Sequence, residues 1–127
     1  LLKFRTLAAE DVSVPRAEFV AGIAGQLDSI HAGLFQRAIA LRVANTRTIA
    51  TAEEFRAYFT PANAAKPEIH GGFALSHWSG DPAVEETVRN DLGVTIRCIP
   101  MDAPEEPGRC VISGQPSNRR VIFAKAY

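Results

Sequence analysis

Two cysteines and two histidines are the residues of this chain whose side chains could bind a metal together. They are Cys98, Cys110, His70 and His77. A structural zinc ion needs four sulfur or nitrogen ligands in a tetrahedron. Neither pair has the close spacing of a metal-ligand motif, so the sequence does not favour a zinc site built from these four. Both cysteines are interpreted instead as small buried apolar side chains.

The same two cysteines could form a disulfide or act in catalysis. A disulfide would require their two strands to lie side by side, and such bonds are rare in a reducing compartment. A nucleophilic cysteine needs a nearby base or a helix N-terminus to form its thiolate, whereas Cys98 lies in a strand of alternating apolar residues. The chain also has no glycine-rich phosphate loop and no signature of an ATP site.

Five basic residues gather in the last third of the chain: Arg97, Arg109, Arg119, Arg120 and Lys125. They could face RNA phosphates. We favour a solvated sheet face, in which they are balanced by the acidic residues Asp102, Glu105 and Glu106. Over the whole chain 14 basic and 14 acidic residues cancel. This balance excludes the overall basic footprint of an autonomous nucleic-acid-binding domain.

The N-terminal half that would position these residues is predicted to be helical. After a strand over residues 1–6, Ser13 and Pro15 mark a helix start. Apolar residues then recur every three or four positions from Phe19 to Leu41, which predicts one long helix. Glycines within this apolar stripe weaken a helix, so packing is expected to stabilise it. Residues 51–54 form a capping box for a second helix.

The C-terminal half is predicted to form a small mixed or antiparallel sheet. Strands are expected over residues 73–78, 94–99, 109–112 and 119–124. A short helix over residues 83–92 is inserted between the first two, and Gly93 is expected to close it in the left-handed conformation. Residues 61–72 are interpreted as a linker. The fold class is therefore α+β: a long N-terminal helix and a second helix packed with a small sheet that carries one inserted helix.

Composition fits one ordinary globular domain. A chain of 127 residues with 46% apolar content can bury roughly two-thirds of its unfolded surface. It lacks an apolar stretch of the roughly 20 residues that a membrane helix needs, and it lacks a signal segment at its start. Because the first residue is Leu1 and not Met, we expect a piece of a longer protein. At the other end a predicted strand runs to Tyr127 without a polar tail, so the terminal carboxylate is expected to be held in place.

Several segments occur in an order and spacing that are hard to attribute to coincidence. They are Leu34-Phe35-Gln36-Arg37-Ala38 with Arg42 and Asn45-Thr46, Glu53-Glu54-Phe55, His77-Trp78 with Gly80, Thr95-Ile96-Arg97-Cys98-Ile99-Pro100, Pro107-Gly108-Arg109-Cys110 and the closing strand to Tyr127. Together they resemble the C-terminal part of prolyl-tRNA synthetases of the archaeal and eukaryotic-like type. The resemblance covers the chain from about Val12 to Tyr127.

Many members of that family carry a zinc ion bound by four cysteines in two pairs. Carried over residue by residue, the four positions fall on Ser79, Val84, Cys110 and Ser113. Only Cys110 keeps a ligand, because serine binds zinc poorly at neutral pH and valine has no donor atom. The resemblance therefore implies a version of the domain without zinc, held by packing.

The resemblance also implies a domain organisation and a parent protein. Residues 1–12 would end an anticodon-binding domain, residues 13–65 would form a helical segment, and residues 66–127 would form the C-terminal α/β domain. The parent enzyme would join proline to its tRNA with ATP and Mg, through a prolyl-adenylate, as a homodimer in the cytoplasm without a membrane anchor.

Within such an enzyme this piece would have no catalytic residue and bind no cofactor. Its partners would be the rest of the synthetase chain and, in the parent, the tRNA for proline. Its role would be structural: the long helix would bridge from the anticodon-binding domain, and the α/β half would pack on the catalytic body. The resemblance places Tyr127 near the active site. The alternative is a stand-alone interaction or regulatory module derived from this domain.

Overall fold

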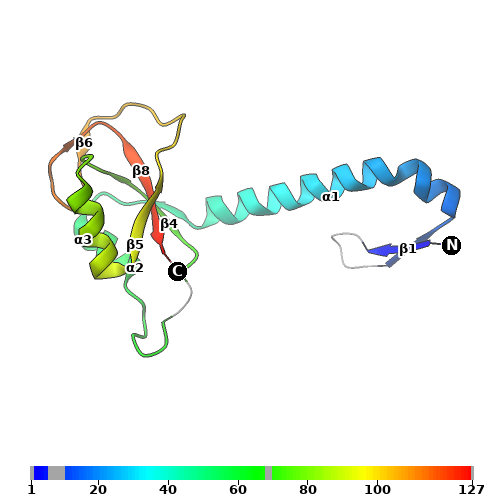
Figure 1. The fold of residues 1–127 in the computed structure, drawn as a ribbon, viewed down its shortest axis with the longest axis horizontal. Helices are drawn as coiled ribbons and strands as arrows, with labels where there is room; N and C mark the ends of the chain where they lie inside the picture. Colours follow the sequence, from blue (N-terminus) through cyan, green and yellow to red (C-terminus); the bar gives the residue numbers. More distant parts are fainter. Residues whose placement is uncertain (1, 6–10, 68–69, 127) are drawn as a thin grey trace. The chain divides into compact units, whose positions relative to one another are not determined.

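The computed structural model describes residues 2–5, 11–67 and 70–126, with side chains from residue 11 onward. The chain folds into two compact units, Leu1–Ala44 and Asn45–Tyr127. Figure 1 colours the first unit from blue to cyan and the second from green to red. The domain limits expected from the sequence, at residues 12 and 65, stay predictions.

The first unit contains one hairpin and one long helix. Strand β1 (Leu2–Arg5) pairs antiparallel with β2 (Asp11–Val14), and helix α1 follows over Arg16–Ala44. The helix begins two residues after the last strand residue, because residues 11–14 pair with β1 and are not free to start it. It ends at Ala44, shortly after Leu41, the last residue of the apolar pattern.

Helix α1 leaves most of its large apolar side chains exposed. Within the described residues none of its side chains is buried, and Leu27, Leu34 and Leu41 of the apolar stripe are 48% to 66% exposed. Phe35 and Val43, which lie off the stripe, are also exposed. We expected the apolar stripe of α1 to be stabilised by packing against other residues. The described residues of the first unit do not provide that packing. Among the described residues there is no helix both long and apolar enough to cross a membrane.

The second unit is built on a four-stranded mixed sheet with the strand order β3-β4-β8-β5. Its strands are β3 (Thr46–Thr48), β4 (Phe73–His77), β5 (Val94–Cys98) and β8 (Arg120–Lys125). Strand β3 runs parallel to β4, and the other pairs are antiparallel. The last strand in the sequence, β8, therefore lies in the middle of the sheet, paired on both sides.

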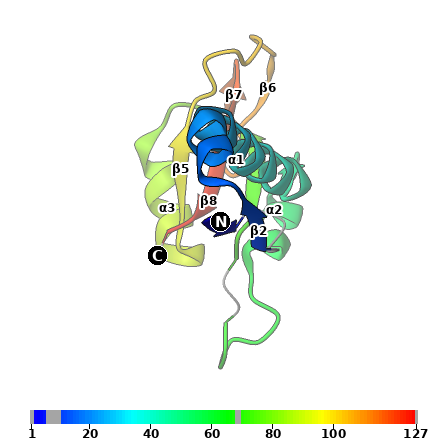
Figure 2. The ribbon, with the colours of Figure 1, turned by 90° about the vertical axis from the view of Figure 1, so that its right-hand side faces the viewer.

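Two short helices complete this unit, and local sequence signals set their ends. Helix α2 (Ala52–Phe59) starts at Thr51, whose hydroxyl accepts a hydrogen bond from the Glu54 N–H at 3.2 Å. Helix α3 (Pro82–Leu92) starts at Asp81 and ends at Gly93, which has φ 66° and ψ 28°. That left-handed conformation suits glycine, as the sequence predicted. Figure 2 shows α3 beside β5 and α2 toward the other edge of the sheet.

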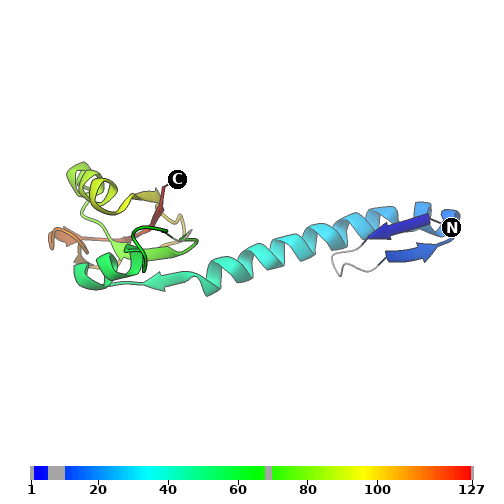
Figure 3. The ribbon, with the colours of Figure 1, turned by 90° about the horizontal axis from the view of Figure 1, so that it is seen from below.

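The core lies between these helices and one face of the sheet. The rings of Phe55 and Phe59 from α2 and Phe123 from β8 are fully buried. The ring of Phe55 meets Phe123 edge-to-face at a centroid distance of 5.1 Å, and Val88 of α3 joins the same cluster. Figure 3 shows both helices beside the strands. Since one cluster contains side chains from both helices and from β8, the predicted α+β class is confirmed.

Candidate functional site

The segment that carries two of the former metal positions is a turn, not the strand expected over residues 109–112. Strands β6 (Gly108–Arg109) and β7 (Pro116–Ser117) pair antiparallel and enclose the turn. The Cys110 N–H donates to the Gln115 carbonyl at 2.8 Å, and the Gly114 N–H donates to the Cys110 carbonyl at 2.9 Å. We call residues 108–117 the Cys110 hairpin. Residues 110–112 are three consecutive apolar residues, and Cys110 and Val111 are buried inside this turn, so an apolar run here does not require a strand.

The structure brings three of the four former metal positions together. Cys110 is 3% exposed, and the side chain of Ser113 and the backbone of Ser79 lie close enough to its thiol to lower its pKa. The fourth position, Val84, is buried in α3 with 5% of its surface exposed. The sequence predicted these positions from the resemblance alone, so the proximity of Ser79, Cys110 and Ser113 is a new geometric observation.

The side chains at these positions do not match the donor set of a zinc ion. They supply one thiol, two hydroxyls and one hydrocarbon group, whereas a structural site needs four strong donors. The Ser113 hydroxyl already contacts the thiol. Over residues 11–67 and 70–126, no three His, Cys, Asp or Glu side chains lie close enough to hold a metal ion. That the protein contains no zinc stays a prediction.

The environment of Cys110 changes the acidity of its thiol. Burial raises the pKa of Cys110, but hydrogen bonds from the side chain and backbone of Ser113, and from the backbone of Ile112 and Ser79, lower it. The hydrogen bonds prevail, so the pKa of this thiol lies below its usual 9.0. Both cysteines are free thiols, and Cys98 is exposed. The expectation that both are buried is therefore wrong for Cys98, since β5 is an edge strand.

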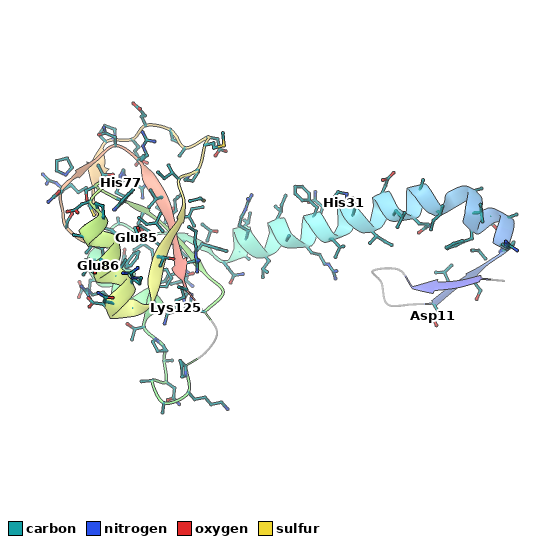
Figure 4. The ribbon with its side chains drawn as sticks, viewed as in Figure 1. Asp11, His31, His77, Glu85, Glu86 and Lys125 are labelled. Atoms are coloured by element: carbon teal, nitrogen blue, oxygen red, sulfur yellow. The ribbon has the colours of Figure 1, made fainter. Side chains whose placement is uncertain are left out.

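A polar network beside the Cys110 hairpin was not foreseen from the sequence. The ring of His77 on β4 is 7% exposed, and its Nδ1 lies 3.1 Å from the Ser117 Oγ. Its Nε2 lies 3.8 Å from Oε1 of Glu106. Arg120 holds the same carboxylate with two hydrogen bonds, of 3.0 Å and 2.9 Å. Figure 4 labels His77 among the side chains of this unit.

The charges in this network shift the pKa of Glu106. Hydrogen bonds from Arg120 lower the pKa of the carboxyl below 4.5, desolvation opposes them, and the charges of Arg120 and His77 lower it further. The bidentate contact also raises the pKa of Arg120. Arg120 is thus an ion-paired residue and not a free cation on a sheet face. The sequence offered no local signal for this pairing, because the partners are distant along the chain.

The serine, histidine and glutamate of this network do not form an activated nucleophile. The single hydroxyl proton of Ser117 is directed at the carbonyl of Trp78 (2.7 Å) or of Arg119 (2.9 Å). Both carbonyl oxygens lie closer to this hydroxyl than Nδ1 of His77, at 3.1 Å, so they compete with the imidazole for its proton. A nucleophile needs a base that accepts its proton, so the arrangement is structural.

The remaining basic residues have varied surroundings. Arg109 is exposed and donates to the Gly114 carbonyl at 3.1 Å, which braces the Cys110 hairpin. Arg97 donates to the Lys125 carbonyl. The solvated sheet face stays the prediction for these residues, and a contact with RNA phosphates stays the alternative. Tyr127, the residue expected near an active site, lies outside the described residues.

Comparison with known proteins gives consistent matches. A family model described as prolyl-tRNA synthetase, C-terminal, matches residues 63–127. The chain is 54% identical over 122 residues to proline–tRNA ligase 2 of Anaeromyxobacter dehalogenans, a match that covers 93% of this chain and 24% of that protein. It is 44% identical over 116 residues to proline–tRNA ligase of Protochlamydia amoebophila, covering 91% and 23%. A proline–tRNA ligase of Chloroflexus aurantiacus is 39% identical over 114 residues, covering 90% and 22%. The chain thus spans about a quarter of the length of these relatives.

Proposed function

Because the chain belongs to the family of prolyl-tRNA synthetase C-terminal domains, we propose that it forms the C-terminal part of a proline–tRNA ligase, which attaches proline to its tRNA with ATP. The observation that carries the proposal is the 54% identity to a protein named proline–tRNA ligase 2, because it extends over 93% of this chain. The archaeal and eukaryotic-like type of the enzyme remains part of the proposal.

The stand-alone module is the weaker alternative. The relatives named above are all proline–tRNA ligases about four times as long as the aligned segment. A module that had evolved apart from the synthetase would not be expected to stay 54% identical to a proline–tRNA ligase over 93% of its length. The parent protein would act with tRNA for proline, ATP and Mg, as a homodimer in the cytoplasm and without a membrane anchor.

The role of this piece in the parent would be to position other groups. The described residues offer neither an activated nucleophile nor a strong zinc donor set, so no cofactor is assigned to them. Strand β8 is paired on both sides, and the Ala126 N–H donates to the Gly93 carbonyl at 2.7 Å. These contacts support the proposal that Tyr127, the next residue, is delivered to a defined place near the active site.

Aminoacylation by the full-length protein that contains this chain tests the proposal. The purified protein should attach radiolabelled proline to its tRNA in the presence of ATP and Mg, and it should elute as a dimer in gel filtration. The 127-residue piece alone should give no proline-dependent pyrophosphate exchange. Failure of the full-length protein to charge tRNA, or exchange by the isolated piece, would overturn the assignment.

Tyr127→Ala in the full-length protein tests the positioning role. We expect a loss of aminoacylation rate on the order of 100-fold, the effect of misplacing a group by about 1 Å, with an unchanged melting temperature. Glu105→Ala is the matched control, since this carboxylate is exposed and lies outside the end of β8. A Tyr127→Ala variant with the wild-type rate would leave the residue without a part in the reaction.

A further inference from the structure

We propose that Arg97 is a positioning residue that holds the end of β8 at Lys125, so that the residue after Ala126 can act in the reaction. This inference rests on the proposed function, because it assumes that Tyr127 lies near an active site. The inference gives a role to Arg97, a residue to which neither the family resemblance nor the comparisons with known proteins assign one. Figure 4 labels Lys125 near the end of β8.

A β-bulge in β5 gives Arg97 its unusual place. Ile96 pairs with Phe123 and Cys98 pairs with the preceding residue, Ile122, so the ladder passes over Arg97 without a partner in β8. A bulge inserts one extra residue into a strand and re-aims its side chain. The side chain of Arg97 therefore need not follow the regular alternation of side chains between the two faces of the sheet. Its Nη2 donates to the Lys125 carbonyl in the neighbouring strand.

The carbonyl that Arg97 holds belongs to the last residue of β8. Lys125 pairs with Val94 at the end of the ladder, beyond which β5 offers no further register partner. Strand ends fray unless another group ties them down. A guanidinium is suited to this task because its charge strengthens a hydrogen bond to a carbonyl and its planar fork is rigid.

A second hydrogen bond holds the residue that follows. The Ala126 N–H donates to the carbonyl of Gly93 at 2.7 Å. Gly93 is the left-handed residue that closes α3, and its own N–H donates to carbonyls in the last turn of that helix. The end of the chain is thus fixed at two consecutive residues, Lys125 by a side chain of β5 and Ala126 by the end of α3.

The position of Arg97 argues against a main role in folding. The residue is exposed, whereas the core contacts of β8 come from Val121 and Phe123, both fully buried. A single exposed hydrogen bond contributes little to stability, because water replaces it when it is lost. We therefore infer that the hydrogen bond of Arg97 serves to place the end of β8 and not to stabilise the fold.

Variants of the full-length protein separate placement from stability. Arg97→Met keeps the length of the side chain and removes its donors, and Arg97→Lys restores one charged donor. We expect Arg97→Met to lower kcat for aminoacylation by about 10-fold or more, with KM for proline and the melting temperature unchanged. Arg97→Lys should recover part of the rate. Arg89→Met is the matched control, because Arg89 is an exposed arginine of α3 whose side chain has no part in the proposal.

A double variant shows whether Arg97 acts through Tyr127. In a Tyr127→Ala background, Arg97→Met should cause little additional loss, because the group that it positions is already gone. A wild-type rate for Arg97→Met, or losses that multiply fully in the double variant, would overturn the inference. Absence of aminoacylation by the wild-type protein would instead overturn the proposed function, so the two failures are distinguishable.

Discussion

Gly108 lies against the ring of His77 so closely that a Cβ atom at position 108 would stand 2.4 Å from Nε2 and 2.5 Å from Cε1. Real Cβ atoms do not approach other heavy atoms to that distance. The ring cannot easily move aside, because it is 7% exposed and its Nδ1 contacts Ser117. The contact joins the start of the Cys110 hairpin to β4, so the hairpin depends on a residue without a side chain.

Gly108→Ala should therefore destabilise the protein by about 1 to 3 kcal/mol, the usual cost of overpacking a buried site. Urea unfolding followed by the fluorescence of Trp78, the only tryptophan, measures the change. Gly71→Ala is the control, because a Cβ there meets no atom within 4 Å. Equal stability of the two variants would contradict the contact.

Glu106→Gln should lower stability near neutral pH and have less effect in acid. The folded-state pKa of Glu106 lies below 4.5, so its ionised form contributes stability above that pH. The contribution is lost as the pH falls through the lowered pKa, because the carboxylate must be protonated in both states. Melting temperatures of wild type and variant should converge as the pH falls below 4.5.

Glu105→Gln provides the comparison for that measurement. Glu105 is the neighbouring exposed carboxylate, whereas Glu106 is held by Arg120 in a bidentate contact. We expect the Glu105 variant to melt within the error of wild type across the same range. A difference between wild type and Glu106→Gln that stays constant from pH 7 to pH 3 would rule out the ion pair as its source.

Thr51→Ala should weaken the start of α2. The variant loses the hydroxyl that accepts from the Glu54 N–H, a change that costs about 1 kcal/mol at most N-caps. Thr51→Ser keeps the acceptor and should restore the stability. The denaturant concentration at half-unfolding is measured for wild type and both variants. An alanine variant as stable as wild type would show that the Thr51 hydroxyl does not stabilise the helix start in solution.

Replacing three side chains should create a zinc site at the four positions that the resemblance assigns to one. The variant Ser79→Cys, Val84→Cys, Ser113→Cys would present four thiols together with Cys110, and we expect about one zinc ion per chain by elemental analysis. Chelation should then lower its stability strongly, since structural zinc contributes on the order of 10 kcal/mol to folding. Wild-type protein should contain far less than one zinc.

A fourth replacement, Cys110→Ser, in that variant leaves three thiols and should bind zinc much more weakly. Stoichiometric zinc in the wild type would refute the zinc-free prediction. If the variant with the three added cysteines and Cys110 binds no zinc, that result would show that the four positions were carried over incorrectly or that the side chain at position 84 faces away from the others.

Sequence patterns predicted what is decided locally. The start of α2 and the end of α3 follow from Thr51 and Gly93, whose effects act within one helical turn. The expected strand over residues 109–112 was wrong, because hydrogen bonds across the Cys110 hairpin decide its shape. The network around His77 could not be predicted either, since Glu106 and Arg120 meet only when β8 has entered the sheet.

The central place of β8 has a consequence for the synthesis of the protein. A ribosome makes β3, β4 and β5 first, but both β4 and β5 pair with β8, which lies between them. Until residues 120–125 leave the exit tunnel, the nascent chain exposes the two strand edges that β8 later pairs with, a hazard for aggregation. It also lacks Phe123, which completes the aromatic cluster. A chain truncated before Arg120 should therefore stay partly unfolded and be recognised by chaperones or proteases.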